Sequence, residues 1–334
     1  MIWVRKERVS LPESAIQRQR EQVVKNQGLK EKSGLQLGPA DWRRPVRVGA
    51  FGVFLLLFII STFFSLFTAT GQALDQLVLD MAMLSFPGAR FFAWPVARSI
   101  SLWGIAAVTL VAALWAVAKR RWELGLRIAI FVLGANLTTQ VLKNWLLGRP
   151  YLGVGFELPN SLPSGHTTVA MCAVLAIVVV APQRVRVPVA IAGALLAASV
   201  AVSVVLLGWH RPSDVVSAIL VVLLWALVLV PHERPQGFSQ GLNLRLLFLN
   251  LGLLSAFLLG CAAFSSRLQS VITQMISSPR APGKVTAAGT PLEVFTMFPG
   301  VTFWFAVFSL AAIVSLVGFV VHFVVLLESG RTNK

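Results

Sequence analysis

Eight apolar stretches, each about 20 residues long, recur along this chain and restrict its fold more than any other feature. A helix of that length is long enough to cross the hydrocarbon core of a bilayer. Hydrophobic residues make up 56% of the 334 residues and charged residues only 13%, and a water-soluble domain cannot bury so much apolar surface. The pattern predicts an all-α, polytopic membrane helix bundle. The expected spans are 46–68, 99–118, 126–147, 166–182, 188–208, 213–231, 246–264 and 303–327.

The charged residues support the same interpretation. The chain carries 29 basic and 13 acidic residues, and its net charge of +16 would suggest a nucleic-acid partner in a water-soluble protein. Here the charges lie between the apolar stretches, and most basic residues fall on one side if the N-terminus is cytoplasmic, as the positive-inside rule requires. We therefore expect an integral plasma membrane protein with both termini in the cytoplasm and no nucleic-acid partner.

Three short polar segments lie at the ends of these apolar stretches. They are KNWLLGRP at residues 143–150, PSGH at 163–166 and HRPSD at 210–214, and they contain two of the four histidines in the chain. With a cytoplasmic N-terminus, all three segments fall at the extracytoplasmic face. The topology thus predicts that residues far apart in the sequence form one site there.

The residue types in these segments suit a phosphate group. Arg149 offers a planar fork for phosphate oxygens, and the helix expected to begin near PSGH directs free amide groups toward an anion. Ser164 supplies a hydroxyl, and Gly165 lets the backbone approach a ligand closely. His210 and Asp214 are four residues apart, so the carboxylate can orient the imidazole and leave its other nitrogen free as a nucleophile.

Together the three segments resemble the type 2 phosphatidic acid phosphatase family of lipid phosphate phosphatases, which shares its site with vanadium haloperoxidases. The family pattern is a lysine, six residues and Arg-Pro, then Pro-Ser-Gly-His, then Ser-Arg, five residues, His, three residues and Asp. The resemblance covers roughly residues 46–231. It implies that His210 is the nucleophile that forms a phosphohistidine, Asp214 its orienting partner and His166 the general acid. The implied phosphate-binding residues are Lys143, Arg149, Ser164 and Gly165.

The chain departs from the family pattern at two positions. Lys143 and Arg149 are separated by five residues instead of six, and one residue turns a helical side chain by about 100°. The family arginine expected six residues before His210 is replaced by Val204. We expect Arg211 to bind the phosphate in its place, with Arg98 as a second candidate. Loss of such a charge can lower the rate about a hundredfold or more.

The predicted activity is hydrolysis of a lipid phosphate or diphosphate at the extracytoplasmic face. Candidate substrates are a polyprenyl diphosphate or phosphate, phosphatidic acid and phosphatidylglycerol phosphate, and the sequence does not choose among them. No metal and no other cofactor are expected, because Asp214 is the only acidic residue on the outer side that belongs to a motif. The alternative, motivated by Val204, is a weak or inactive family member that binds lipid phosphates or acts as a scaffold. A transporter is disfavoured because no internal repeat is evident.

The predicted organisation has three parts. Residues 1–45 form a basic cytoplasmic tail, and residues 46–231 form a six-span phosphatase core. Residues 232–334 contain a loop, two additional C-terminal spans and a short cytoplasmic end. The expected partners are the bilayer and its lipid phosphate substrate, and a homo-oligomer formed through the extra spans is left open.

Overall fold

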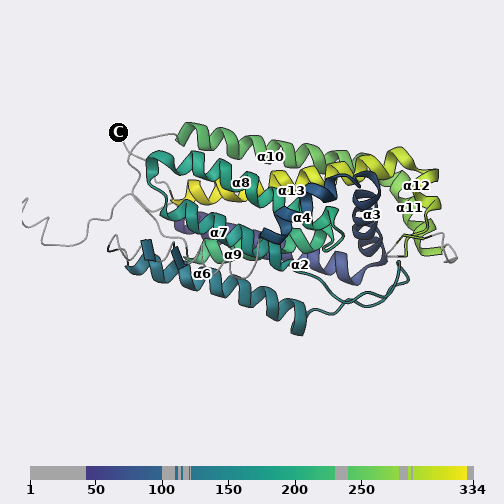
Figure 1. Ribbon diagram of the computed structural model, residues 1–334, viewed down its shortest axis with the longest axis horizontal. Helices are drawn as coiled ribbons and strands as arrows, with labels where there is room; N and C mark the ends of the chain where they lie inside the picture. Colours follow the sequence, from purple (N-terminus) through teal and green to yellow (C-terminus); the bar gives the residue numbers. More distant parts are fainter. Residues whose placement is uncertain are drawn as a thin grey trace, which may run out of the picture. The chain divides into compact units, whose positions relative to one another are not determined.

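The computed structural model describes residues 43–99, 110–111, 114–115, 120, 122–229, 240–277, 285–286 and 289–328. The chain divides into two compact units, Met1–Val46 and Arg47–Lys334, and apart from the first residues of α2 every helix described belongs to the second unit. Within the described residues all regular structure is helical except one isolated β-bridge between Val285 and Pro291 (Figure 1). The helices are α2 (Arg43–Phe67), α3 (Ala69–Ser85), α4 (Ala89–Ser99), α6 (Trp122–Val141), the π-helical turn η1 (Leu142–Leu146), α7 (Gly165–Val180), α8 (Gln183–Leu206), α9 (Pro212–Leu229), α10 (Gln240–Ala263), α11 (Ser265–Ser277), α12 (Glu293–Met297) and α13 (Pro299–Glu328).

Six of these helices are long and apolar enough to cross a membrane, and each coincides with one of the eight predicted spans. They are Pro45–Phe67, Trp122–Leu146, Gln183–Leu206, Pro212–Leu229, Gly241–Ala263 and Pro299–Leu327. The prediction of an all-α membrane bundle is therefore confirmed. The stretch predicted at 166–182 is α7, a shorter helix of 16 residues that extends about 24 Å. The stretch predicted at 99–118 lies mostly outside the described residues.

The core of the bundle includes the C-terminal helix. Helix α7 packs against α6, α8 and α9, and α13 packs against α8, α9, α10 and α3 (Figure 1). One continuous set of buried apolar side chains runs through α6, α7, α8, α9 and α13 and includes Phe131, Leu175, Leu223 and Val321. The packing alone therefore does not separate a six-span core from two additional spans.

Helix α10 lies at the margin of this core. It packs on α13, to which a buried polar pair joins it: Asn243 donates to the carbonyl of His322 (3.1 Å), and its side-chain oxygen lies 2.9 Å from Nδ1 of His322. Its outward side chains, among them Phe248 and Leu259, are exposed. Such an apolar exposed surface suits contact with lipid or with another membrane helix.

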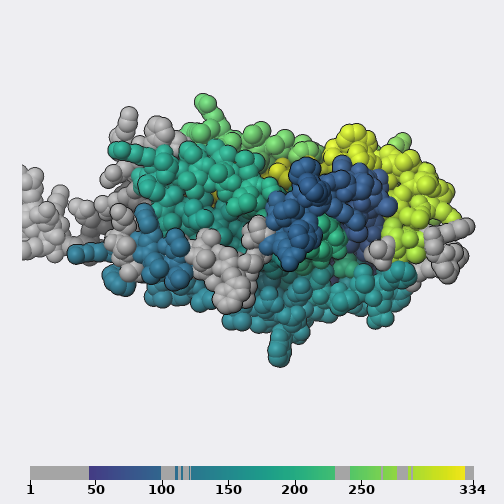
Figure 2. Space-filling model, viewed as in Figure 1, coloured from purple at the N-terminus to yellow at the C-terminus, as the bar shows by residue number. Residues whose placement is uncertain are grey.

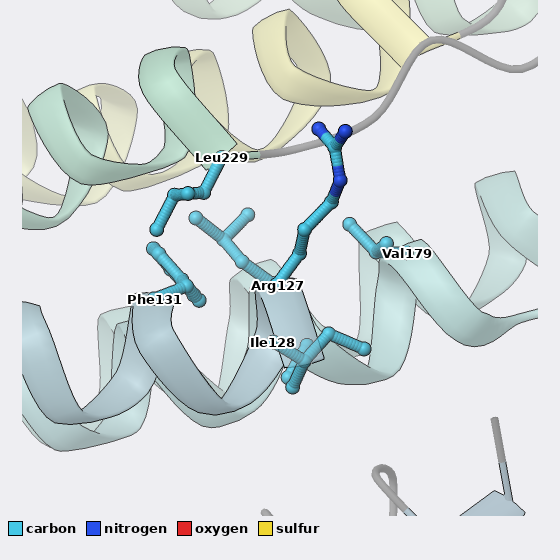
Figure 3. A pocket seen from close by; sticks show the side chains of 7 residues that line it. Arg127, Ile128, Phe131, Val179 and Leu229 are labelled. Atoms are coloured by element: carbon cyan, nitrogen blue, oxygen red, sulfur yellow. The ribbon is translucent and has the colours of Figure 1, made fainter. Parts of the chain in front are cut away.

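The packing is tight where α6 begins and where α7 and α9 end. A gap of only about 10 Å³ remains there, lined by Arg127 and apolar side chains that include Ile128, Phe131, Val179 and Leu229 (Figure 3). Arg127 directs its guanidinium away from these apolar side chains, as basic residues near the ends of membrane helices commonly do. The larger polar cluster of the molecule lies at the other ends of these helices.

Two shorter helices follow α2. Thr68 caps α3 by accepting a hydrogen bond from the amide of Gly71 (3.0 Å), and α4 follows after a brief turn. Helix α3 contacts α8, α9, α11 and α13. Figure 2 shows α3 and α4 in blue beside the start of α13 in yellow. Helix α3 thus connects the N-terminal and C-terminal parts of the bundle.

Gly208 sets the turn between α8 and α9. Its φ of 75° lies in the left-handed region, and a Cβ at this position would lie 2.5 Å from Sδ of Met83. In the same turn the amides of Trp209 and His210 both donate to the carbonyl of Val204, at 3.0 and 3.1 Å. The turn therefore fixes how His210 leaves the end of α8.

Replacing Gly208 with alanine is expected to reduce the free energy of unfolding by about 1–3 kcal/mol, because alanine is strained at this φ and its methyl group meets Met83. Thermal unfolding of the detergent-solubilised protein measures the effect. The control is Gly252→Ala in α10, where an added Cβ meets nothing within 4 Å and the change raises helix propensity. Equal unfolding midpoints for the two variants would contradict this role of Gly208.

Candidate active site

The structure brings the three polar segments together. PSGH lies at the start of α7, KNWLLGRP begins in η1, and HRPSD joins α8 to α9. The ring centroids of His166 and His210 are 6.1 Å apart, and those of His166 and Trp209 are 5.4 Å apart. An imidazole from α7 and one from the α8–α9 loop thus lie close together.

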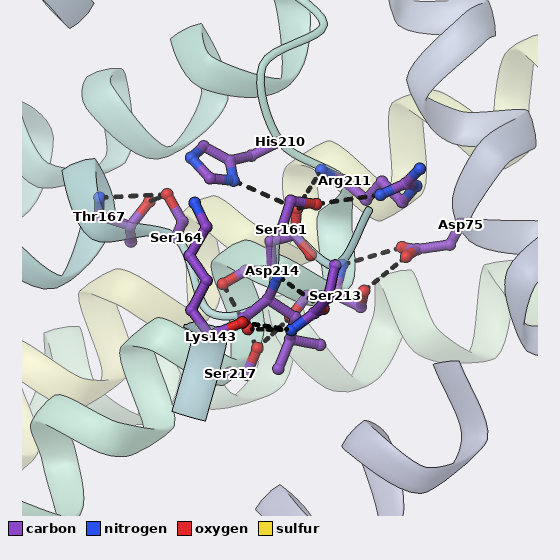
Figure 4. A network of polar contacts seen from close by, with 12 residues as sticks. Asp75, Lys143, Ser161, Ser164, Thr167, His210, Arg211, Ser213, Asp214 and Ser217 are labelled. Carbon is purple, nitrogen blue, oxygen red and sulfur yellow. Dashed lines mark hydrogen bonds and ion pairs between the residues drawn. The ribbon is translucent and has the colours of Figure 1, made fainter. Parts of the chain in front are cut away.

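Asp214 orients His210. The carboxylate is buried, and its Oδ2 lies 3.2 Å from Nδ1 of His210 (Figure 4). The same oxygen accepts hydrogen bonds from the amide of Arg211 (2.9 Å) and the hydroxyl of Ser161 (2.6 Å). With Nδ1 directed at a carboxylate, Nε2 is the ring nitrogen left to act as a nucleophile.

Ser164 connects this network to the start of α7. Its amide donates to the carbonyl of Asp214 (2.8 Å), and its Oγ accepts from the amide and the hydroxyl of Thr167 at 3.4 and 3.2 Å. Ser164 is therefore the N-cap of α7, and it retains its hydroxyl hydrogen as a donor because both side-chain bonds use the oxygen as acceptor. Gly165 follows as the first residue of the helix, where amide groups favour an anion.

Lys143 lies within η1, the π-helical turn that ends α6. In a π-helix the hydrogen bonds close over five residues, as from the amide of Leu147 to the carbonyl of Leu142 (2.9 Å), so the side-chain directions differ from those of an α-helix. Figure 4 shows the Lys143 side chain extending toward Ser164 and His210. The structure thus brings Lys143 to the site although five residues, not six, separate it from Arg149.

Asn160 holds η1 against the PSGH segment. Its side-chain amide donates to the carbonyls of Lys143 (3.2 Å), Leu147 (3.0 Å) and Leu162 (3.0 Å). Asn160 and Ser161 were not predicted as site residues, since neither belongs to a motif. Their position shortly before PSGH was the only feature of the sequence that could have indicated a role in the site.

Two guanidinium groups add positive charge near the histidines. Arg211 is buried and donates from Nη1 to the hydroxyl of Ser161 (3.0 Å), while its buried Nε has no partner among the described residues. Burial and the nearby charge of Arg211 lower the pKa of Arg149 to about 10, so Arg149 remains cationic at neutral pH. Like charges brought close together are costly unless an anion offsets them.

Val204, where the resemblance predicts an arginine, lies in apolar surroundings. The Val204 side chain is fully buried in the hydrophobic core, and only its carbonyl reaches the α8–α9 turn. Arg211 belongs to the Asp214 network, whereas the guanidinium of Arg98 lies over the ring of Trp94 on its own helix, 4.6 Å from the centroid. Of the two arginines predicted to supply the missing charge, the structure brings Arg211 into the cluster of polar residues around Asp214.

Helix α3 contributes a polar face that the sequence analysis did not identify. Asp75 accepts hydrogen bonds from the amide (2.9 Å) and the hydroxyl of Ser213, and Gln72 donates to the carbonyl of Pro150 (2.8 Å). Asp80 accepts a hydrogen bond from Gln76 (2.9 Å). The spacing of these polar residues by three to five positions was the signal for one helical face. Among the described residues no group of three or more His, Cys, Asp and Glu side chains is placed to hold a metal ion.

These features define an integral membrane protein with a polar site, lined by histidine and arginine, at the ends of its helices. Residues 124–235 contain all eight predicted site residues and match the model of the PAP2 superfamily. The crystal structure of the first transmembrane PAP2 type phosphatidylglycerolphosphate phosphatase from Bacillus subtilis is similar to 54% of this chain and 93% of that chain, with 21% identity and a TM-score of 0.46. No curated protein matches.

The pH dependence of stability should report on Asp75. Burial and the nearby charge of Asp214 raise the pKa of Asp75 to about 6, so the folded chain binds this proton more tightly than the unfolded chain does. The proton therefore contributes full stability below about pH 4 and loses that contribution as the pH rises through 6. We expect wild type to lose about 2 kcal/mol relative to Asp75→Asn between pH 4 and pH 8.

The measurement is denaturant unfolding of the detergent-solubilised proteins from pH 4 to pH 8. A pH-independent difference in the free energy of unfolding between wild type and Asp75→Asn reports only the changed hydrogen bonds to Ser213. The test is therefore how this difference changes with pH. Glu293→Gln, at an exposed carboxyl, serves as the control and should follow wild type. A difference that does not vary with pH would contradict the proton linkage.

Proposed function

We propose that this protein hydrolyses a lipid phosphate or diphosphate through a phosphohistidine intermediate at the extracytoplasmic face of the plasma membrane. The observation that carries the proposal is the pairing of two imidazoles, with ring centroids 6.1 Å apart, beside a carboxylate-bound Nδ1 on His210. The Lys143 side chain extends toward His210 (Figure 4), and the charges of Arg149 and Arg211 are close enough to interact with each other and with Asp214. The proposed site lies at membrane depth, which suits a substrate whose tail stays in the bilayer.

In the first step, Nε2 of His210 attacks phosphorus and the bond from phosphorus to the leaving oxygen breaks. His166 donates a proton to that oxygen, so the lipid leaves as an alcohol or a monophosphate. Asp214 stabilises the cationic imidazole that forms on His210. In the second step, His166 removes a proton from water, which attacks the phosphohistidine and releases inorganic phosphate and free His210.

The cationic groups carry most of the proposed rate acceleration. Phosphoryl transfer passes through a loose transition state, so the protein acts mainly by positioning groups and stabilising charge. Lys143, Arg149 and the amide of Gly165 are proposed to hold the equatorial oxygens together with the Ser164 hydroxyl. Arg211 supplies the charge that Val204 lacks. None of these steps uses a metal, and activity is expected to persist in the presence of a chelator.

A second candidate function is lipid-phosphate binding without turnover. The observation that favours it is Val204, whose buried side chain leaves the expected arginine position without charge. In this alternative the cationic cluster retains a phosphate headgroup, and His210 does not attack it. The two functions differ in one measurable respect, the release of inorganic phosphate.

Purified wild type is expected to release phosphate from at least one member of a panel of phosphatidic acid, phosphatidylglycerol phosphate, polyprenyl phosphate and polyprenyl diphosphate. His210→Ala should lower this activity by about 10³-fold or more, because it removes the nucleophile. Substrate labelled with ³²P should transfer its label to wild type as an acid-labile, base-stable adduct and not to His210→Ala. Binding of lipid phosphate without release by wild type would instead support the second function.

The role of Arg211 is tested against Arg98, the other arginine considered. Arg211→Ala should lower kcat/KM by about a hundredfold, the cost typical of losing one preorganised charge in a transition state. Arg98→Ala should change it by less than about twofold, since surface substitutions away from a site have small effects. Comparable losses in the two variants would show that Arg211 does not fill the missing role.

A further inference from the structure

A large apolar cavity lies directly beside the proposed active site. Its volume is about 560 Å³, and its walls come from α2, α3, α9, α10 and α13. This volume is within the range typical of ligand pockets. The lining includes Phe64 of α2, Asp75 of α3, Ser213 of α9, Leu254 of α10 and Leu316 of α13.

The few hydroxyl groups in the wall already have partners: that of Ser213 donates to Asp75, and the other three donate to carbonyls of their own helices. Ser61 donates to the carbonyl of Phe58 (3.2 Å), Ser65 to Thr62 (3.3 Å) and Ser309 to Phe305 (2.8 Å). The remaining wall away from the active site is hydrocarbon or sulfur. A polar, water-soluble ligand would lose its hydration there without gaining partners, so the chemistry of the wall fits an aliphatic chain.

The cavity and the proposed active site share a wall. Asp75 and Ser213 line the cavity and are hydrogen-bonded to each other, at 2.9 Å from the Ser213 amide. Ser213 directly precedes Asp214, and the Arg211 guanidinium is close enough to Asp75 to affect its ionisation. A molecule with its phosphate at His210 and its chain in the cavity would therefore pass the Asp75–Ser213 pair.

We propose that this cavity binds one hydrocarbon chain of the lipid phosphate and thereby determines which tails the enzyme accepts. The inference rests on the proposed function. A tail that enters the cavity leaves one apolar environment for another, so the selection comes from fit and not from hydrophobicity. Helices α10 and α13 lie outside residues 124–235, so this chain builds part of its tail site from segments beyond the superfamily match.

The test narrows the cavity with Leu254→Trp on α10 and compares it with Leu253→Trp. Leu254 lines the cavity, whereas its neighbour Leu253 is 40% exposed and does not. Each variant is assayed on pairs of substrates that share a headgroup and differ in tail: dioleoyl and dihexanoyl phosphatidic acid, and polyprenyl and isopentenyl diphosphate. Leu316→Trp narrows the cavity from α13 as a second variant.

Leu254→Trp is expected to reduce kcat/KM for the long-tailed substrate by about tenfold or more, the usual scale for a misfit in an apolar pocket. The short-tailed substrate should be hydrolysed within about twofold of wild type, which also shows that the variant is folded. Leu253→Trp should change neither value. Equal losses for both tails, or no loss for either in both cavity variants, would overturn the tail site. If wild type hydrolyses none of the lipids, the proposed function is overturned instead. In that case, binding of dioleoyl phosphatidic acid by Leu253→Trp but not by Leu254→Trp would still support the tail site in the cavity.

Discussion

The arrangement of the site depends on one buried carboxylate oxygen, Oδ2 of Asp214. It receives hydrogen bonds from Ser161 and the Arg211 amide and lies against Nδ1 of His210. A buried carboxylate is costly unless several donors surround it, and here those donors come from two separate segments of the chain. The backbone carbonyl of the same residue accepts from the Ser164 amide, so the first turn of α9 is joined at two atoms to the segment that leads into α7. The positions of both histidines follow from this junction.

The apolar surroundings make such a junction necessary. Helix ends in a membrane protein expose backbone groups that must find partners, and side chains that are polar at this depth must be paired with one another. Asn160 donates to two carbonyls where α6 and η1 end and to the carbonyl of Leu162 before α7, and Asp75 of α3 binds the start of α9. The helix termini are thereby held in register, and the same polar groups that satisfy the backbone also surround the proposed phosphate position.

The sequence predicted the features that depend on local pattern. The length of the apolar stretches was sufficient to predict the six helices that can span a membrane. The spacing of the motifs, together with helix periodicity, was sufficient to place PSGH and HRPSD at helix ends. What it did not predict depends on packing between distant segments. The polar face of α3 acquires its role only because Ser213 lies opposite Asp75, and α13 joins the core through contacts with α8 and α9 that no local pattern encodes. The π-helical turn at Lys143 likewise compensates for a spacing that α-helical geometry alone made unfavourable.

Val204 and Arg211 act at the two ends of the α8–α9 turn. The Val204 side chain packs in the core, and its carbonyl holds the turn. Arg211 lies on the α8–α9 loop itself, and its amide binds the same Asp214 oxygen that orients His210. Its guanidinium contacts Ser161, which also binds that oxygen. In this chain, therefore, the proposed phosphate-binding charge and the orientation of the proposed nucleophile depend on one loop, so that a shift of the loop would disturb both together.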